Sequence, residues 1–154
     1  MEVKYLILAR YAEFTPDGML NMIGGDHDKF IAEEYPYIQP QIVAAARVAL
    51  NKEDCAIEHT FKSLLVQEDT QEVVAEGPSG TFPVLPIPAD ANFLGAGVLL
   101  MFHNTIFTKP GLYAAQLMID DAVLSTARLR VAPAAYFQAR QKLMQTKQKD
   151  TSDA

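Results

Sequence analysis

The sequence predicts an all-β domain, an antiparallel two-sheet β-sandwich that ends in a short α-helix. Three observations support this prediction. Valine, isoleucine, leucine and tyrosine gather in short runs, as they do in β-strands. Turn-forming residues separate these runs at frequent intervals. Only the part of the chain after Pro133 has an apolar stripe at helical spacing. We expect roughly seven to nine strands, as in typical sandwiches.

The chain opens with a predicted hairpin. Val3–Phe14 is rich in strand-forming residues, and its nearly continuous apolar start is typical of a strand buried on both faces. Pro16-Asp17-Gly18 then supplies turn residues, because proline presets its φ and glycine accepts a positive φ. Leu20–Ile23 returns as the second strand, and Gly24-Gly25 ends it.

The sequence of residues 26–67 predicts a loop followed by two strands. Residues 26–41 are expected to be a loop with one helical turn around Lys29–Glu34. Ile42–Leu50 is a strand whose alanines leave room for a neighbour to approach closely. Cys55–Gln67 is the following strand, with His59 expected as a hydrogen-bonded residue of the core or of the sheet edge.

Proline and glycine divide the second half of the chain. Gln71–Ala75 is predicted to be a strand that Gly77-Pro78-Ser79-Gly80 breaks. Phe82–Pro88 contains three prolines and is expected to be an extended crossover rather than a central strand. Asn92–Phe102 is predicted to be a strand, in which Gly95 and Gly97 mark a bulge or a close backbone approach.

The chain is expected to close with a hairpin and a helix. Leu112–Ile119 and Val123–Val131 form the predicted hairpin. We expect a sandwich domain over residues 1–132, a helix over residues 133–147 that packs on the domain or on a partner, and a disordered tail over residues 148–154.

Composition excludes several function classes. The 154 residues fit one domain, and the net charge of −6 argues against nucleic-acid and anionic-membrane partners. Phe93–Phe102, the longest apolar run, is too short for a membrane helix, and the opening has no signal-peptide pattern. Cys55 is the only cysteine, which favours a reducing, cytoplasmic compartment.

Two motifs carry a family resemblance. The first is Tyr5-Leu6-Ile7-Leu8-Ala9 with Tyr11-Ala12-Glu13, followed by Asp17-Gly18 and Leu20-Asn21-Met22-Ile23-Gly24-Gly25. The second is Lys109-Pro110-Gly111-Leu112-Tyr113, a Pro-Gly-x-Tyr hairpin motif that many immunoglobulin-like domains share. The chain resembles a family of small bacterial all-β proteins of unknown function. The resemblance implies a sandwich of general immunoglobulin- or C2-like architecture, and it implies no catalytic residue.

The loop after the first hairpin contains a weak candidate for a metal site. Asp26, His27 and Asp28 carry carboxylate and imidazole groups that divalent metals accept, with Glu13 or Asp17 nearby if the hairpin folds back. Adjacent residues do not easily point at one ion, however, and the spacing matches no known metal motif. The favoured interpretation is a polar loop, and no metal is predicted.

Nothing in the sequence favours catalysis or a cofactor. Cys55 has no basic neighbour in the sequence that would activate its thiol, and no Gly-x-Ser-x-Gly elbow presents a nucleophile. The glycine-rich stretches 77–80 and 95–97 lack the Lys-Ser/Thr ending of a phosphate-binding loop. We therefore expect a protein that is not an enzyme and has no cofactor.

Two apolar regions indicate partner binding. The proline-stiffened segment after Phe82 forms either a preorganised binding surface or a cover for one end of the sandwich. The terminal helix has an apolar stripe that packs on its own sheet or on a neighbour. The candidate partner-binding residues are Phe82, Val84, Leu85, Ile87, Tyr136, Phe137, Leu143 and Met144.

The leading hypothesis for function is a non-catalytic protein-binding or assembly module, which binds another protein or a second copy of itself. Two alternatives stay open. One is a protein that binds a small molecule or a divalent metal near Asp26–Asp28. The other is a structural subunit of a larger bacterial or phage-like particle.

Overall fold

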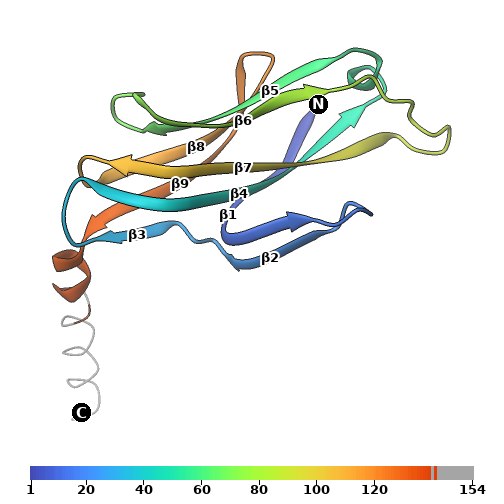
Figure 1. The fold of residues 1–154 in the computed structure, drawn as a ribbon. Helices are drawn as coiled ribbons and strands as arrows, with labels where there is room; N and C mark the ends of the chain where they lie inside the picture. The colour runs from blue at the N-terminus through green and yellow to red at the C-terminus, as the bar shows by residue number, and fades with distance from the viewer. Residues whose placement is uncertain (140, 142–154) are drawn as a thin grey trace, which may run out of the picture.

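The computed structural model describes residues 1–139 and 141, and it is mostly β-structure (Figure 1). Sheet A has the strand order β2-β1-β4-β7, and sheet B has the order β3-β9-β8-β5-β6. The described residues contain nine strands: β1 (Glu2–Phe14), β2 (Leu20–Gly25), β3 (Lys29–Ala32), β4 (Tyr37–Asn51), β5 (His59–Gln67), β6 (Val73–Phe82), β7 (Phe93–Phe107), β8 (Gly111–Ile119) and β9 (Ala122–Pro133). A 3-10 turn, η1 (Asp54–Ala56), follows β4, and residues 134–139 are helical. The prediction of a mostly β protein with two sheets and a short helix is confirmed.

The strands pair antiparallel, with the exception of β3, which runs parallel to β9. The helical turn predicted around Lys29–Glu34 is therefore wrong. Phe30 and Ala32 alternate into the core at 5% and 0% exposure, and this period of two fits a strand. The N–H group of Arg130 also donates a hydrogen bond to the carbonyl of Asp28 at 2.7 Å, which holds the start of β3 against β9.

The main hydrophobic core lies between the two sheets, because its buried side chains come from both. Sheet A contributes residues of β1, β4 and β7, and sheet B contributes residues of β3, β5, β6, β8 and β9. The largest side chains that are almost completely buried include Ile42, Leu65, Leu100, Phe102, Phe107, Tyr113, Leu117 and Leu129. Sheet B curls into half of a barrel around this core.

Strand β4 is buried on both of its faces. Its residues Ala44, Ala45 and Ala46 are all 0% exposed, although successive side chains of a strand point to opposite faces. One face meets the main core, and the other belongs to a second, smaller core that contains Ala9, Ala12, Val43 and Ala45. β1 pairs with β4 only as far as Ala9, and the rest of β1 pairs with β2. This later part of β1 contributes Ala12 to the second core.

The β1–β2 hairpin covers the outer face of β4 and β7, the other two strands of sheet A. A Cβ atom at Gly97 of β7 would lie 2.8 Å from the Phe14 ring, so the ring rests directly on the glycine backbone. Arg47 of β4 lies against Gly95 in the same way, and its Nη1 donates a hydrogen bond to the carbonyl of Gly18 at 2.7 Å. The close approach predicted at Gly95 and Gly97 is therefore confirmed.

Strand β6 continues through the glycines that were expected to break it, so that prediction is wrong. β6 is the outermost strand of sheet B, where a proline is tolerated. Gly77 gives room to two neighbours, since a Cβ atom there would lie 2.5 Å from Ser63 Oγ and 2.9 Å from the Phe102 ring. Ser63 Oγ donates a hydrogen bond to the carbonyl of Pro78 at 2.8 Å, which fixes the strand at this point.

Tyr113 closes the connection between β7 and β8. Its hydroxyl donates a hydrogen bond to the carbonyl of Lys109 at 2.8 Å, although the side chain is only 2% exposed. Its ring meets the Phe107 ring edge to face, with 4.6 Å between the centroids. The tyrosine of the Pro-Gly-x-Tyr motif thus anchors the turn that precedes its own strand.

We predict that Gly97→Ala destabilises the protein by about 1–3 kcal/mol, the usual cost of overpacking, because the added methyl group meets the Phe14 ring. The measurement is urea unfolding. Gly111→Ala is the matched control, since its nearest neighbour would be Tyr113 at 3.8 Å. In a Phe14→Ala background the cost of Gly97→Ala should shrink. An undiminished cost there would show that the hairpin does not cover Gly97.

Candidate functional site

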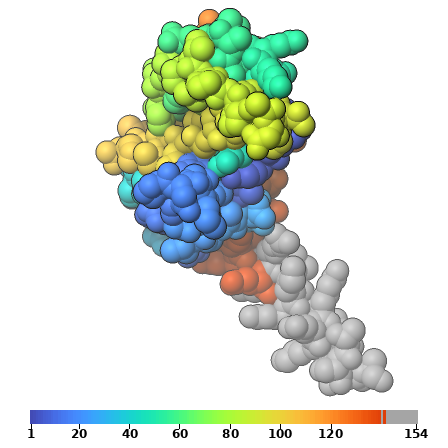
Figure 2. All heavy atoms as spheres, turned by 90° about the vertical axis from the view of Figure 1, so that its right-hand side faces the viewer, coloured from blue at the N-terminus to red at the C-terminus, as the bar shows by residue number. Residues whose placement is uncertain are grey.

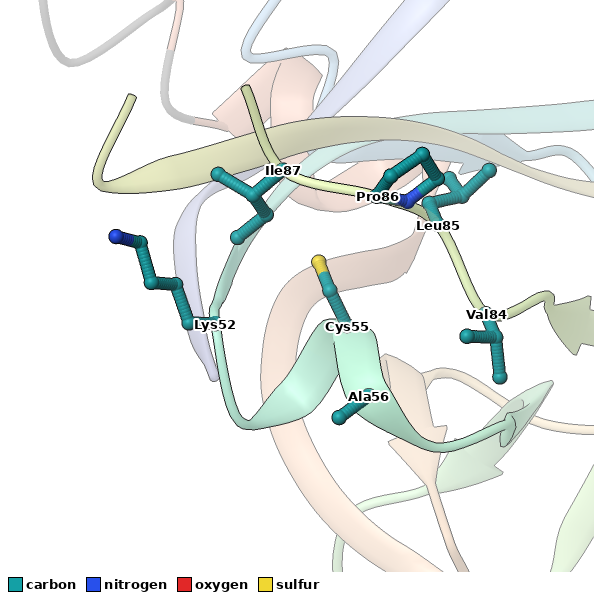
Figure 3. Close-up of a pocket in the computed structure, with 7 residues that line it drawn as sticks. All are labelled: Lys52, Cys55, Ala56, Val84, Leu85, Pro86 and Ile87. Carbon is teal, nitrogen blue, oxygen red and sulfur yellow. The ribbon is translucent and has the colours of Figure 1, made fainter. Parts of the chain in front are cut away.

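A hollow of about 510 Å³ opens where η1 meets the segment between β6 and β7. The end of the molecule that contains η1 and this segment faces the viewer in Figure 2, and Figure 3 shows the hollow in detail. Its lining residues are Lys52, Cys55, Ala56, Val84, Leu85, Pro86 and Ile87. The lining is mainly apolar, and Lys52 is the one charged residue among these seven. The site is therefore suited to binding apolar groups.

Polar contacts hold η1 in place. Asn51 Oδ1 accepts hydrogen bonds from the N–H groups of Glu53 and Asp54, both at 2.9 Å. Asp54 Oδ2 in turn accepts one from the N–H group of Asn51 at 2.9 Å and lies 2.6 Å from the amino group of Met1. Desolvation raises the pKa of Asp54, but these hydrogen bonds outweigh it, so the pKa lies below its ordinary value. The carboxylate stays ionised and fixes the turn.

His59 links η1 to the turn between β8 and β9. Its Nε2 lies 3.0 Å from the carbonyl oxygen of Asp54, and its Nδ1 lies 2.6 Å from Asp120 Oδ2. Asp120 Oδ1 also accepts a hydrogen bond from the N–H group of Thr60 at 3.0 Å. The hydrogen bond with His59, followed by that from Thr60, holds the pKa of Asp120 below its ordinary value. The expectation of a hydrogen-bonded core histidine is confirmed.

The segment that follows β6 forms the other wall of the hollow. The N–H group of Leu85 donates a hydrogen bond to the carbonyl of Cys55 at 3.3 Å, which joins the two walls. Val84 and Leu85 are 58% and 43% exposed, whereas Ile87 is half-buried against the main core. Figure 3 shows the Cys55 sulfur pointing toward this segment. The segment therefore covers the core and also presents an apolar surface.

Phe82 occupies a different place from the other candidates of this segment. It is 8% exposed, and its ring lies 5.2 Å from the Phe61 ring. Phe82 therefore belongs to the core and anchors the start of the segment, which leaves Val84, Leu85 and Ile87 at the hollow.

The helical candidates lie at a separate surface. Tyr136 is 48% exposed, and its ring meets that of Phe137 edge to face at 5.7 Å. Tyr136 also lines a second hollow of about 280 Å³, together with Arg130 and Pro133. Leu143 and Met144 lie outside the described residues.

The loop Asp26–Asp28 has local partners in the structure. The N–H group of Asp28 donates to the carbonyl of Asp26 at 2.8 Å, and the His27 ring packs edge to face on Phe30 at 4.9 Å. Burial, and then the charge of Arg10, lower the pKa of His27. Over residues 1–139 and 141, no three His, Cys, Asp or Glu residues are grouped so that they could hold a metal ion.

The acidic residues of the hairpin do not join this loop. Glu13 accepts hydrogen bonds from Tyr11 and Asn21, and Asp17 accepts one from Thr15. The hairpin does fold back, as the metal hypothesis required, but onto sheet A rather than toward Asp26–Asp28.

Sequence reasoning missed one wall of the hollow. Lys52, Cys55 and Ala56 precede Val84 by about thirty positions in the chain. The asparagine and acidic residues around η1 indicated a turn, but no sequence signal shows that the carbonyl of Cys55 binds Leu85. This contact depends on how β4 and β6 end at the same side of the molecule (Figure 1).

Sequence comparison finds one family. The sequence model of a family of unknown function (DUF6941) matches residues 4–132. No curated protein sequence matches the chain. In the described part of the chain, no helix combines the length and apolar character that a membrane span needs.

Two solved structures show distant similarity. The Pseudomonas fluorescens alkylpurine DNA glycosylase AlkC, bound to DNA containing an abasic site analog, is 10% identical with a TM-score of 0.41, over 85% of this chain and 30% of that protein. A glycosyl hydrolase family 2 member from Bacteroides cellulosilyticus is 9% identical with a TM-score of 0.34, over 61% of this chain and 14% of that one. The chain thus spans less than a third of either protein, and these similarities carry no functional argument.

We predict that Asp120→Asn destabilises the protein most above about pH 4. The pKa of Asp120 is lower in the folded protein than in the unfolded chain, so its carboxylate stabilises the fold above the unfolded pKa. This contribution disappears as the pH falls through the folded pKa, and the stability difference from wild type should shrink. Unfolding free energies measured across the acid range test this.

Asp121→Asn is the control for this experiment, because the neighbouring carboxylate is 84% exposed and pairs with Lys62 at the surface. It should have a small effect that salt weakens. A stability difference for Asp120→Asn that stays constant with pH would contradict the role of its charge.

Proposed function

The chain belongs to this family of unknown function, and from that premise we propose that it is a non-catalytic protein-binding module of the bacterial cytoplasm. Its binding site is the hollow between η1 and the Val84–Ile87 segment. One observation carries the proposal: Val84 and Leu85 line an apolar hollow, and these residues stay 58% and 43% exposed to solvent.

The proline-rich segment is preorganised for binding. Pro83, Pro86 and Pro88 restrict the backbone, and the hydrogen bond from Leu85 to Cys55 fixes its position. A partner that binds here loses little chain entropy in ordering the segment, so more of the contact energy remains as affinity. Fully burying one valine or leucine side chain contributes about 1.5–3 kcal/mol. A partner that covers the exposed parts of Val84 and Leu85 gains a part of this for each side chain.

The chemistry of the rim favours an extended apolar segment of another protein as the occupant. Ile57, which follows η1, is 58% exposed and extends the apolar surface beyond the hollow. The Lys52 ammonium group lines the same hollow and complements an acidic residue next to the apolar side chains of the partner. An extended peptide presents both groups within a few residues.

The architecture and the compartment are part of this proposal. We assign the two sheets to a β-sandwich of general immunoglobulin- or C2-like type. The core shared by both sheets and the hydrogen bond from Tyr113 to Lys109, which resembles a tyrosine corner, support this assignment. The single cysteine supports a reducing compartment.

We predict that Val84→Asp abolishes capture of the partner, because a carboxylate at the hollow opposes apolar burial. The experiment is a pulldown with the tagged chain, followed by cross-linking and mass spectrometry to locate the bound segment. Val123→Asp is the matched control, since Val123 is 49% exposed on β9 and does not line the hollow.

The cross-linked segment is then made as a peptide, and its affinity for the three proteins is measured by fluorescence polarisation. The proposal requires binding to wild type and to Val123→Asp, with loss of binding to Val84→Asp. Equal binding to all three proteins would place the partner elsewhere, and capture of no protein would reject the proposed function.

A further inference from the structure

The described part of the chain has four edge strands, and three of them are protected. β3 has only four residues and begins with Lys29. β6 contains Glu76 and Pro78 and has two register irregularities. β7 lies alongside β6, where Gly77 packs on Phe102. Proteins prevent edge strands from pairing with other chains by making them short, by placing charged residues or proline on them, by irregular strand register, or by covering them with another element.

Strand β2 (Leu20–Gly25) has none of these chemical protections. It contains no charged residue and no proline, and five of its six residues are exposed. Among the described strands its backbone pairs only with β1, which leaves its outer edge open (Figure 1). Ile23 is 66% exposed and Met22 is 37% exposed, so apolar side chains flank this edge.

The hairpin adds apolar surface around β2 and presents it rigidly. Tyr11, at 48% exposure, is the cross-strand partner of Ile23, and Met19 at the turn is 64% exposed. The packing of Phe14 on Gly97 and the hydrogen bond from Arg47 to Gly18 fix the hairpin on sheet A. A rigid, apolar edge with unpaired backbone groups is a template for a further strand.

We propose that β2 pairs antiparallel with β2 of a second copy of this chain. The pairing joins two four-stranded sheets into one sheet across a two-fold axis. Such an axis brings two copies of the same short strand side by side, so charged residues on it would lie close to like charges of the other copy. β2 contains no charged residue, so this pairing brings no charges of the strand itself together, although the chain as a whole carries a net charge of −6.

This interface is separate from the hollow and does not depend on the proposed function. A partner segment at Val84 and a second copy at β2 occupy different elements, and each is tested by its own variants.

The test is sedimentation velocity of the full chain over a range of micromolar concentrations. Wild type should show a reversible dimer. Ile23→Lys should weaken dimerisation by about tenfold or more, because two ammonium groups then approach across the axis. Asn21→Lys, at a second exposed position of β2, should have the same effect. Ile106→Lys is the control, since Ile106 is 52% exposed on β7, at the other edge of sheet A.

Circular dichroism establishes that each variant is folded. A wild-type chain that is monomeric at every concentration would overturn the proposal. A dimer that survives both β2 variants, or that is lost with Ile106→Lys instead, would equally overturn it.

Discussion

The burial of β4 on both faces is the constraint on which the rest of this structure depends. Ala44, Ala45 and Ala46 have no exposed surface, and their small side chains let the neighbouring elements approach β4 closely on both of its faces. The main core then packs against one face and the β1–β2 hairpin against the other. The packing of the hairpin also determines where β2 lies, so the interface proposed there depends on this packing.

The sequence predicts where strands occur better than it predicts which elements each strand pairs with or packs against. The opening hairpin and the close approach at Gly97 follow from local chemistry, because turn residues and strand glycines act over a few positions. β3 escapes prediction, since its four residues become a strand only by pairing with β9, about a hundred positions later. The continuation of β6 through Gly77 depends in the same way on Ser63 and Phe102.

The hollow shows the same division between local and long-range information. The proline-rich segment is visible in the sequence as a stiff apolar stretch, and the structure keeps Val84 and Leu85 exposed. The opposite wall comes from η1, which the network of Asp54, His59 and Asp120 holds in place. With the amino group of Met1, which lies against Asp54, the network joins three separate parts of the chain, so no short sequence motif indicates it. The proposed binding site therefore depends on surfaces that tertiary contacts assemble.

The fold-back of the hairpin is the central structural claim, and NMR tests it directly. In a nuclear Overhauser spectrum of the labelled protein, the ring protons of Phe14 should give strong cross-peaks to the α protons of Gly97, because the ring rests on that backbone. The absence of these cross-peaks, with Phe14 showing contacts only to its β2 partner Leu20, would mean that the hairpin extends away from sheet A. The outer face of β4 would then be uncovered, contrary to this account.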